Sequence, residues 1–235
     1  MTTAVSNLVV PPPPLQTSVQ RFIDAVKTSH KLLQLHPRKR GGAGNFAALS
    51  PAIVLGTVAA FEGFAEDFTA LSMAHTGSTY AQIARKIGNW NNPSIWDLRD
   101  SLGKQFPHMK QILGSGPAIA IHKPPAVGAK GWWEWESRAW NDALDDSRSW
   151  MQVRHLLTHG LTTGWRSEWW PGPSKAGEPA ASDVLRKMPK GKHSLVLHGA
   201  ISCARIYTLG AQFLADTVAT DLGQQLDWAQ LPAFE

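Results

Sequence analysis

The stretch SPAIVLGTVAAFEGFAEDFTALSMA, residues 50–74, is the most hydrophobic part of the chain. Wound as an α-helix, it presents large apolar side chains around most of its circumference: Ile53, Val54, Val58, Phe61, Phe64, Phe68 and Leu71. A helix of this kind must be covered by other helices, so the segment predicts the central helix of a bundle. Ser50 and Pro51 predict its start, with the serine as N-cap and the proline at the first helical position.

Two glutamates lie beside this apolar surface. Glu62 is on the flank of the predicted helix, and Glu66 follows one turn later. A carboxylate near an apolar face needs a partner, because without one burial raises its pKa. The sequence leaves two interpretations of Glu62 open: a solvated or ion-paired glutamate, or a carboxylate that orients a catalytic group.

Further helices are expected on both sides of this segment. Apolar residues recur at helical spacing from Thr17 to just before Pro37, and helices are also expected at about 80–87, 93–106, 133–161 and 197–222. The helix expected at about 93–106 should begin at Pro93, because proline suits the first helical position. Signals for β-strands are nearly absent, so the sequence predicts an all-α helical bundle.

Two long loops rich in Trp, Gly and Pro elaborate the predicted bundle. They cover residues 114–131 and 162–192, and one helical turn is expected near 183–187. Long loops inside a compact domain are often functional. Residues 1–16, which include the four prolines at 11–14, predict an extended tail, and residues 17–235 predict a single helical domain.

The composition narrows the setting in which such a domain works. The net charge of +5 favours an anionic partner, and the single cysteine, Cys203, allows neither an internal disulfide nor a cysteine-based zinc cage. Acidic residues, among them Asp67, interrupt the longest apolar stretch, and no signal peptide is recognisable. We therefore expect a soluble cytoplasmic protein with no membrane partner.

Tryptophan is unusually frequent, with eleven residues against two tyrosines. Many of them flank residues 154–160 on both sides. Large aromatic side chains usually serve packing or subunit contacts, but they also form stacking platforms for unpaired bases. Both interpretations stay open, as they do for the basic stretch 38–42, which is either a solvated connector or a nucleic-acid contact.

The segment RHLLTHG, residues 154–160, concentrates the groups best suited to chemistry near neutral pH. On a helix, His155 and His159 share a face that lies nearly opposite an apolar arc formed by Trp150, Val153, Leu157 and Leu161. Arg154 lies between the two faces, about 140° from His159 at 100° per residue. To meet at one phosphate, Arg154 and His159 need a long reach, a helix irregularity or a second copy of the helix.

A histidine pair at this spacing is also half of a helical zinc site. Two further ligands would be needed, and Cys203, His193 and His198 are available in the sequence. No pair of cysteines and no His-Glu-x-x-His pattern accompanies them. We therefore expect neither a metal nor another cofactor.

Residues 154–160 resemble the Arg-polar-x-x-x-His signature of HEPN domains, with Arg154, His155 and His159 on its defined positions. The chain is similar to the RiboL-PSP branch of that family in two further stretches, AFEGF at 60–64 and NPSIWDL at 92–98. The resemblance covers residues 17–222 in order. It departs from the family in its longer Trp-rich flanks and in having His155 where Asn is common.

This resemblance implies a HEPN-like helical bundle and a metal-independent endoribonuclease that works as a homodimer. In that reading His159 moves protons between the ribose 2′-hydroxyl and the leaving 5′-oxygen, and Arg154 binds the scissile phosphate. His155 orients its neighbours or touches the RNA, and Glu62 holds Arg154 or a histidine. The family further implies a role in phage defence or as a toxin, with a possible antitoxin or regulatory protein partner.

Two other functions remain open at this point. The first is a catalytically silent HEPN-like module that binds RNA or a protein and keeps the motif for its dimer structure. The second is a basic all-α DNA-binding protein, although no helix-turn-helix spacing supports it.

Overall fold

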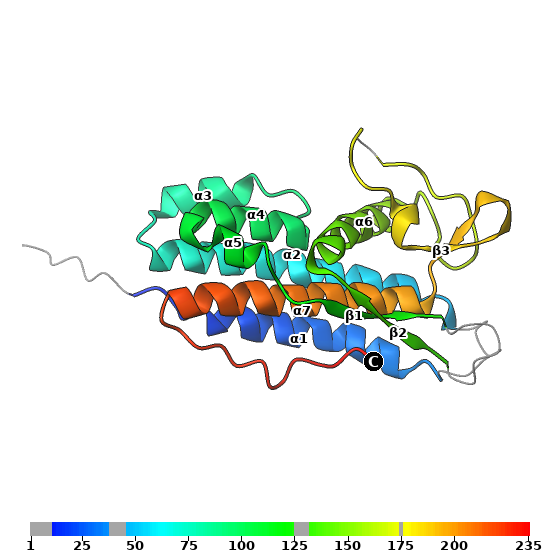
Figure 1. Cartoon of the computed structure of the whole chain (residues 1–235), viewed down its shortest axis with the longest axis horizontal. Coiled ribbons are helices and arrows are strands. Elements are labelled where there is room, and N and C mark those ends of the chain that lie inside the picture. The colour runs from blue at the N-terminus through cyan, green and yellow to red at the C-terminus, as the bar shows by residue number, and fades with distance from the viewer. Residues whose placement is uncertain (1–10, 38–45, 125–131, 174–175) are drawn as a thin grey trace, which may run out of the picture.

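Three long helices run side by side along the molecule in the computed structural model (Figure 1). They are α1 (Gln16–Gln34), α2 (Leu49–His75) and α7 (Leu197–Asp221). The structure describes residues 11–37, 46–124, 132–173 and 176–235, and within these ranges the chain is mostly helical. The expected all-α class is confirmed at this level.

The remaining elements cover one side and one end of the three long helices (Figure 1). The helices are α3 (Tyr80–Gly88), α4 (Ile95–Gln105), α5 (Lys110–Leu113), α6 (Trp140–Thr158) and the short 3₁₀ turns Pro107–Met109, Ala181–Val184 and Pro189–Gly191. The strands are β1 (Ile119–Lys123), β2 (Glu134–Arg138), β3 (Arg186–Lys187) and β4 (His193–Ser194).

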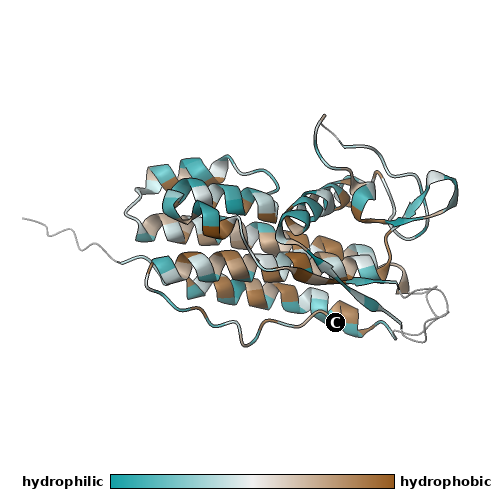
Figure 2. Ribbon diagram, in the orientation of Figure 1, coloured by the Kyte–Doolittle hydropathy of each residue, from teal (hydrophilic) through white to brown (hydrophobic). Residues whose placement is uncertain are grey.

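The core lies between α2 and its neighbours, as its apolar sequence predicts. Hydrophobic residues gather on α2 and α7, whereas α3 and the β3–β4 hairpin are mostly hydrophilic (Figure 2). Phe61 of α2 packs edge-on against Tyr207 of α7, with ring centroids 4.9 Å apart, and Phe64 stacks with Phe68 at 5.4 Å. Burial of such rings supplies most of the favourable free energy that joins the helices.

The start of α2 differs from the expectation. The helix begins at Leu49 after Ala48, and no side chain caps it, so Ser50 is not the N-cap. The chain already turns at residues 46–48, which brings Ser50 into the first turn, where it is buried. Pro51 still lies in that turn, where a missing backbone N–H costs no hydrogen bond.

The start of α4, in contrast, is later than expected. The helix begins at Ile95 rather than at Pro93, with Ser94 as its N-cap, because Ser94 and Asp97 form a capping box. The Asp97 carboxylate accepts the Ser94 N–H at 2.8 Å, and the Ser94 hydroxyl accepts the Asp97 N–H at 3.3 Å. The box satisfies N–H groups that the helix leaves without partners, so it sets the boundary.

The region 114–138 contains strands where a loop and a helix were expected. β1 pairs antiparallel with β2, with Ile121 opposite Glu136, and β1 packs on α7. The expected loop 114–131 is therefore wrong at 119–123, and the expected helix over 133–161 begins only at Trp140. The segment EWESR consists of residues that also suit helices, and it becomes a strand through pairing with a distant segment.

The expected loop 162–192 is in part a folded lobe. It contains the 3₁₀ turn Ala181–Val184, close to the helical turn expected at 183–187, and the hairpin β3–β4. Glu168 joins the hairpin through a bridge to His193, with both N–H···O distances near 3 Å (3.0 and 2.9 Å). We refer to the described residues between 160 and 195 as the C-terminal lobe.

The chain after α7 runs back along α1 (Figure 1). Gln16 exchanges two hydrogen bonds with the backbone of Asp227, and Phe234 is buried against His30. At the other terminus, residues 11–14 precede α1 without regular structure, whereas residues 1–10 of the expected tail and the basic stretch 38–42 lie outside the described residues.

One described helix, α2, is long and apolar enough to cross a membrane by length and composition alone. The same helix is packed between α1 and α7. The central helix of a folded domain has the same composition for a different reason, namely burial among other helices.

Candidate functional site

The motif segment 154–160 lies at the C-terminal end of α6. The helix ends at Thr158, His159 is the C-cap, and Gly160 follows with φ +66°. The N–H of Gly160 donates to the Leu157 carbonyl at 3.3 Å, and that of Leu161 to the Leu156 carbonyl at 3.0 Å. This pair of bonds is a Schellman cap, in which glycine takes the left-handed conformation that other residues avoid. The His-Gly ending of the motif is therefore explained by the helix stop.

Arg154 is held by two side chains from other parts of the fold. Its Nη2 lies 2.8 Å from Oε2 of Glu62 on α2, and its Nη1 donates to Oδ1 of Asn92 at 3.0 Å. Both carboxylate and guanidinium are partly buried, with 15% and 19% of their side chains exposed. The structure therefore shows Glu62 in an ion pair whose partner is the arginine of the motif, and whether the carboxylate orients a catalytic group depends on the role of that arginine.

Burial leaves Glu62 in an unfavourable setting. The loss of solvent raises the pKa of its carboxyl, and the guanidinium of Arg154 opposes that rise. Among the described residues, the second carboxylate oxygen, Oε1, is buried without a hydrogen-bond partner. The contact with Arg154 is thus the interaction that favours the charged form of this carboxyl.

Asn92 has a conformation that few residue types adopt. Its φ is +52°, in the left-handed region, where asparagine is enriched among non-glycine residues. The unusual backbone aims the amide of Asn92 at Arg154, immediately before Pro93 and the capping box of α4. In the sequence, Asn92 lies in a family-like stretch and has no assigned role, although an Asn before Pro is a turn signal that could have pointed to it.

His155 and His159 lie together, as the helical spacing predicts. Their ring centroids are 4.4 Å apart with the planes inclined by 48°. His155 is partly buried and His159 is exposed. The two imidazoles therefore form a solvent-accessible pair at the end of α6, and histidine is the side chain best suited to accept and donate protons near neutral pH.

The apolar arc of α6 agrees with the expectation at three of its four positions. Trp150 and Val153 are buried and Leu157 packs against the core. Leu161 is 57% exposed, because the helix ends three residues earlier and the chain leaves in the left-handed turn at Gly160. The guanidinium of Arg154 bonds to Glu62 and Asn92, whereas the ring of His159 contacts that of His155, so the arginine and this histidine have different partners.

A pocket of about 370 Å³ opens beside the motif. Both His155 and Asn92 line it, together with the amide of Gln152, the carboxylate of Glu178 and the ring of Trp96. Gln152 donates to Glu178 at 2.9 Å. Two guanidiniums, those of Arg99 and Arg148, lie 5.4 and 5.2 Å from the Trp96 ring centroid, a cation–π arrangement that fixes the ring.

The additional zinc ligands available in the sequence do not join the histidine pair. Cys203 is buried in the middle of α7, His198 stacks on Trp132 with centroids 4.3 Å apart, and His193 lies in β4. In the parts of the chain that the structure describes, no three His, Cys, Asp or Glu side chains gather where they could hold a metal ion.

Comparisons of the chain with protein-family models, with curated proteins and with solved structures find no match.

Proposed function

We propose that this protein is an endoribonuclease with a HEPN-like helical bundle, which cleaves RNA without a metal at a site composed from two copies of the α6 end. The observation that supports the proposal most is that one helix end carries both an arginine held by two side chains and two adjacent histidines. Arg154 is held by Glu62 and Asn92, and His155 and His159 lie 4.4 Å apart on the neighbouring, accessible face.

The proposed reaction uses the nucleophile that RNA itself supplies. His159 of one protomer accepts the proton of the ribose 2′-hydroxyl, which attacks the adjacent phosphorus and forms a 2′,3′-cyclic phosphate. The bond to the 5′-oxygen breaks, and His159 of the second protomer donates a proton to that leaving oxygen. His155, in contact with His159, orients the imidazole or touches the RNA backbone.

Arg154 is proposed to bind the scissile phosphate. Two of its five N–H donors are engaged by Glu62 and Asn92, which leaves three for the oxygens of the phosphate. A guanidinium that is already fixed loses little conformational freedom when it binds, and it stabilises the charge that develops in the transition state. Glu62 and Asn92 are therefore proposed as positioning residues for Arg154.

The composite arrangement follows from the divergence of the two side chains. Arg154 faces α2, whereas His159 is exposed beyond the end of α6. A two-fold axis near the α6 ends would place the arginine of one protomer beside the histidine of the other. We propose a role in phage defence or as a toxin, with a possible antitoxin or regulatory partner, in the cytoplasm.

A second candidate is a catalytically silent module of the same kind, which binds RNA or a protein. One observation favours it: both terminal nitrogens of Arg154 already have partners within the protein, which is what a purely structural arginine also shows. The two candidates differ in a single measurable property, the cleavage of RNA.

The test is an incubation of the purified protein with single-stranded RNA in the presence of EDTA. Arg154→Ala and His159→Ala are compared with the wild type and with two matched surface controls, Arg21→Ala and His108→Ala, whose side chains are 68% and 63% exposed. We expect cleavage with 2′,3′-cyclic phosphate ends in the wild type and both controls. An RNA with 2′-deoxy sugars should stay intact. Equal background in all five proteins would exclude the enzyme and leave the silent module.

A further inference from the structure

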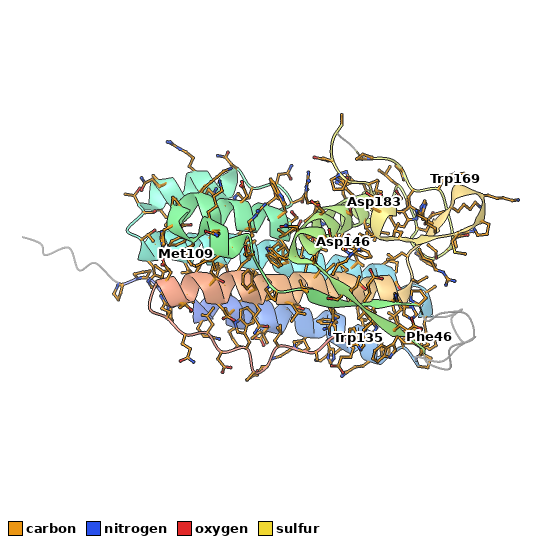
Figure 3. All side chains as sticks on the ribbon, in the orientation of Figure 1. Phe46, Met109, Trp135, Asp146, Trp169 and Asp183 are labelled. Carbon is orange, nitrogen blue, oxygen red and sulfur yellow. The ribbon has the colours of Figure 1, made fainter. Side chains whose placement is uncertain are left out.

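The tryptophans divide into two groups in the structure. Trp140, Trp150 and Trp170 are buried in the core, and several others pack against it. Trp135 is 41% exposed, with the guanidinium of Arg205 over its ring, whereas Trp165 and Trp169 expose 64% and 66% of their surface. Both belong to the C-terminal lobe, and Trp169 lies beside the β3–β4 hairpin (Figure 3). Packing therefore accounts for most of this residue type but not for these two.

Trp169 is fixed in its exposed position by the hairpin. It directly follows Glu168, which bridges to His193 of β4. Its ring lies against Gly191, where an added Cβ would come within 2.8 Å of the indole, so only glycine leaves room for the ring. An exposed aromatic ring that the fold holds rigidly loses little entropy when another flat group stacks on it.

Trp165 is tied to the end of α6. The Glu168 carboxylate accepts the N–H groups of Thr163 and Gly164, which closes the loop that carries Trp165. Gly164 lies against Leu157, since an added Cβ there would be 2.8 Å from the Leu157 side chain. Leu157 belongs to the last turn of α6, two residues before His159, so Trp165 follows a residue anchored at the motif.

The hairpin beside Trp169 is positively charged. Arg186, Lys187 and Lys190 are exposed, and Lys192 is partly so. Lys190 has φ +61°, a left-handed conformation that is unfavourable for lysine and directs the chain at the hairpin tip. The acidic side chains described in the lobe have hydrogen-bond partners outside the hairpin: Glu168 binds the 163–164 backbone, Glu178 accepts from Gln152 and Asp183 accepts the Ala180 N–H.

We propose that Trp165, Trp169 and the cations of the β3–β4 hairpin form a docking platform for single-stranded RNA that extends the candidate site beyond the end of α6. Exposed rings with interleaved cations are the combination that binds unpaired bases and their phosphates. The charge of the hairpin argues for an anionic chain over an apolar partner. The choice of RNA over DNA rests on the proposed function.

The test measures RNA binding in the His159→Ala background, in which the proposed cleavage is absent. The probe is a fluorescein-labelled single-stranded RNA followed by anisotropy. Trp165→Ala and Trp169→Ala should each weaken binding about tenfold, as expected for the loss of one stacked base. Lys187→Ala and Lys190→Ala should each lower the slope of log affinity against log salt by about 0.7.

Matched controls come from exposed residues on other elements. Tyr80→Ala, on α3, removes an aromatic side chain that is 86% exposed, and Lys31→Ala, on α1, removes an exposed lysine. Both should leave the affinity unchanged. Trp169→Ala could loosen the hairpin because the ring packs on Gly191, so thermal unfolding by circular dichroism is recorded for every variant. Trp165 and Lys190 test the platform independently of that contact.

The platform and the proposed function fail in different ways. Normal RNA affinity in the Trp165, Trp169 and Lys190 variants overturns the platform, whether or not the wild type cleaves RNA. If the wild type never cleaves RNA but these variants bind RNA more weakly, the ribonuclease proposal is overturned and the platform is supported. Self-association of the variants is followed by light scattering. If the variants no longer self-associate but bind RNA with unchanged affinity, the surface binds a second copy of the chain and the platform is overturned.

Discussion

Nη2 of Arg154 lies 2.8 Å from Oε2 of Glu62, and this ion pair ties the end of α6 to the central helix α2. The two residues are 92 positions apart in the chain. The pair therefore joins the arginine of the motif to the central helix of the fold, while the neighbouring His159 is exposed. Its partly buried setting has consequences for stability and for pH dependence.

Glu62→Ala is expected to destabilise the protein by about 2 kcal/mol, because a partly buried guanidinium loses its counter-charge. Glu62→Gln keeps an oxygen that can accept from Arg154 and should cost less. Urea unfolding followed by circular dichroism gives both values. The control is Asp67→Ala, on the same helix as Glu62, which breaks a more exposed ion pair with Arg21 of α1. It should change the free energy of unfolding by less than about 1 kcal/mol.

Glu62 should also make stability depend on pH in a defined direction. Burial raises the pKa of this carboxyl above its ordinary value of 4.5. The folded state then holds the proton more tightly than the unfolded state, so the stabilising contribution is complete below pH 4.5 and is lost as the pH rises through the raised pKa. Burial also raises the pKa values of Asp146 and Asp216. The contribution of Glu62 is therefore the difference between the pH dependence of stability in the wild type and that in Glu62→Gln. Parallel pH profiles of the two proteins would contradict this prediction.

A mixture of Arg154→Ala and His159→Ala protomers should recover cleavage that neither variant shows alone. The mixed dimer retains one Arg154 and one His159 on different chains, whereas each single-variant dimer lacks one of these residue types altogether. The recovered cleavage should stay below that of the wild type, because only one of the two proposed proton-transferring His159 side chains remains. Refolding the variants together and assaying single-stranded RNA measures the recovery. Activity no greater than the sum of the separate variants would mean that one arginine and one histidine on different chains do not make a working site.

Two substitutions of Asn92 separate the effect of backbone conformation on stability from the effect of the hydrogen bond to Arg154. Asn92→Gly removes the amide bound to Arg154 and suits the left-handed backbone, whereas Asn92→Ala removes the amide but keeps a β-carbon at φ +52°. We expect the alanine variant to be less stable than the glycine variant by about 1 kcal/mol. Both should lower kcat on RNA, because Arg154 loses one of its two supports. Equal unfolding free energies would show that the backbone here is not strained.

Gly160→Ala should lower stability by about 1 kcal/mol through conformation alone. An added Cβ at Gly160 meets no atom within 4 Å, but φ is +66°, so the cost arises from the left-handed backbone. Gly172 also has open space where a Cβ would lie and no positive φ, so Gly172→Ala is the matched control and should be neutral. Thermal unfolding of the two variants checks this difference.

Local sequence patterns were sufficient for the helical framework. The apolar circumference of residues 50–74 predicted a central helix, and α2 is that helix. The boundaries of α3 and α7 differ from the expected ones by one residue, and the face shared by His155 and His159 is confirmed by their ring contact. These features depend on the helical period of 3.6 residues and on side chains close in sequence, so they are readable without the fold.

Features that depend on distant partners were not readable in this way. β1 and β2 exist because residues 119–123 and 134–138 pair with each other while β1 packs on α7. Likewise, Asn92 and Glu62 meet Arg154 only because α2 and the start of α4 pack against α6. The assignment to the HEPN family and its ribonuclease activity stay predictions.

By itself, the sequence determined the central helix, the helical class and the turn of α6 that carries Arg154, His155 and His159, since each follows from local periodicity and from the residue types present. Only the tertiary structure decided that Glu62 and Asn92 hold Arg154 and that Trp165 and Trp169 are exposed. The physical reason is that exposure and ion pairing depend on which distant segments pack together, and a local pattern carries no information about that choice.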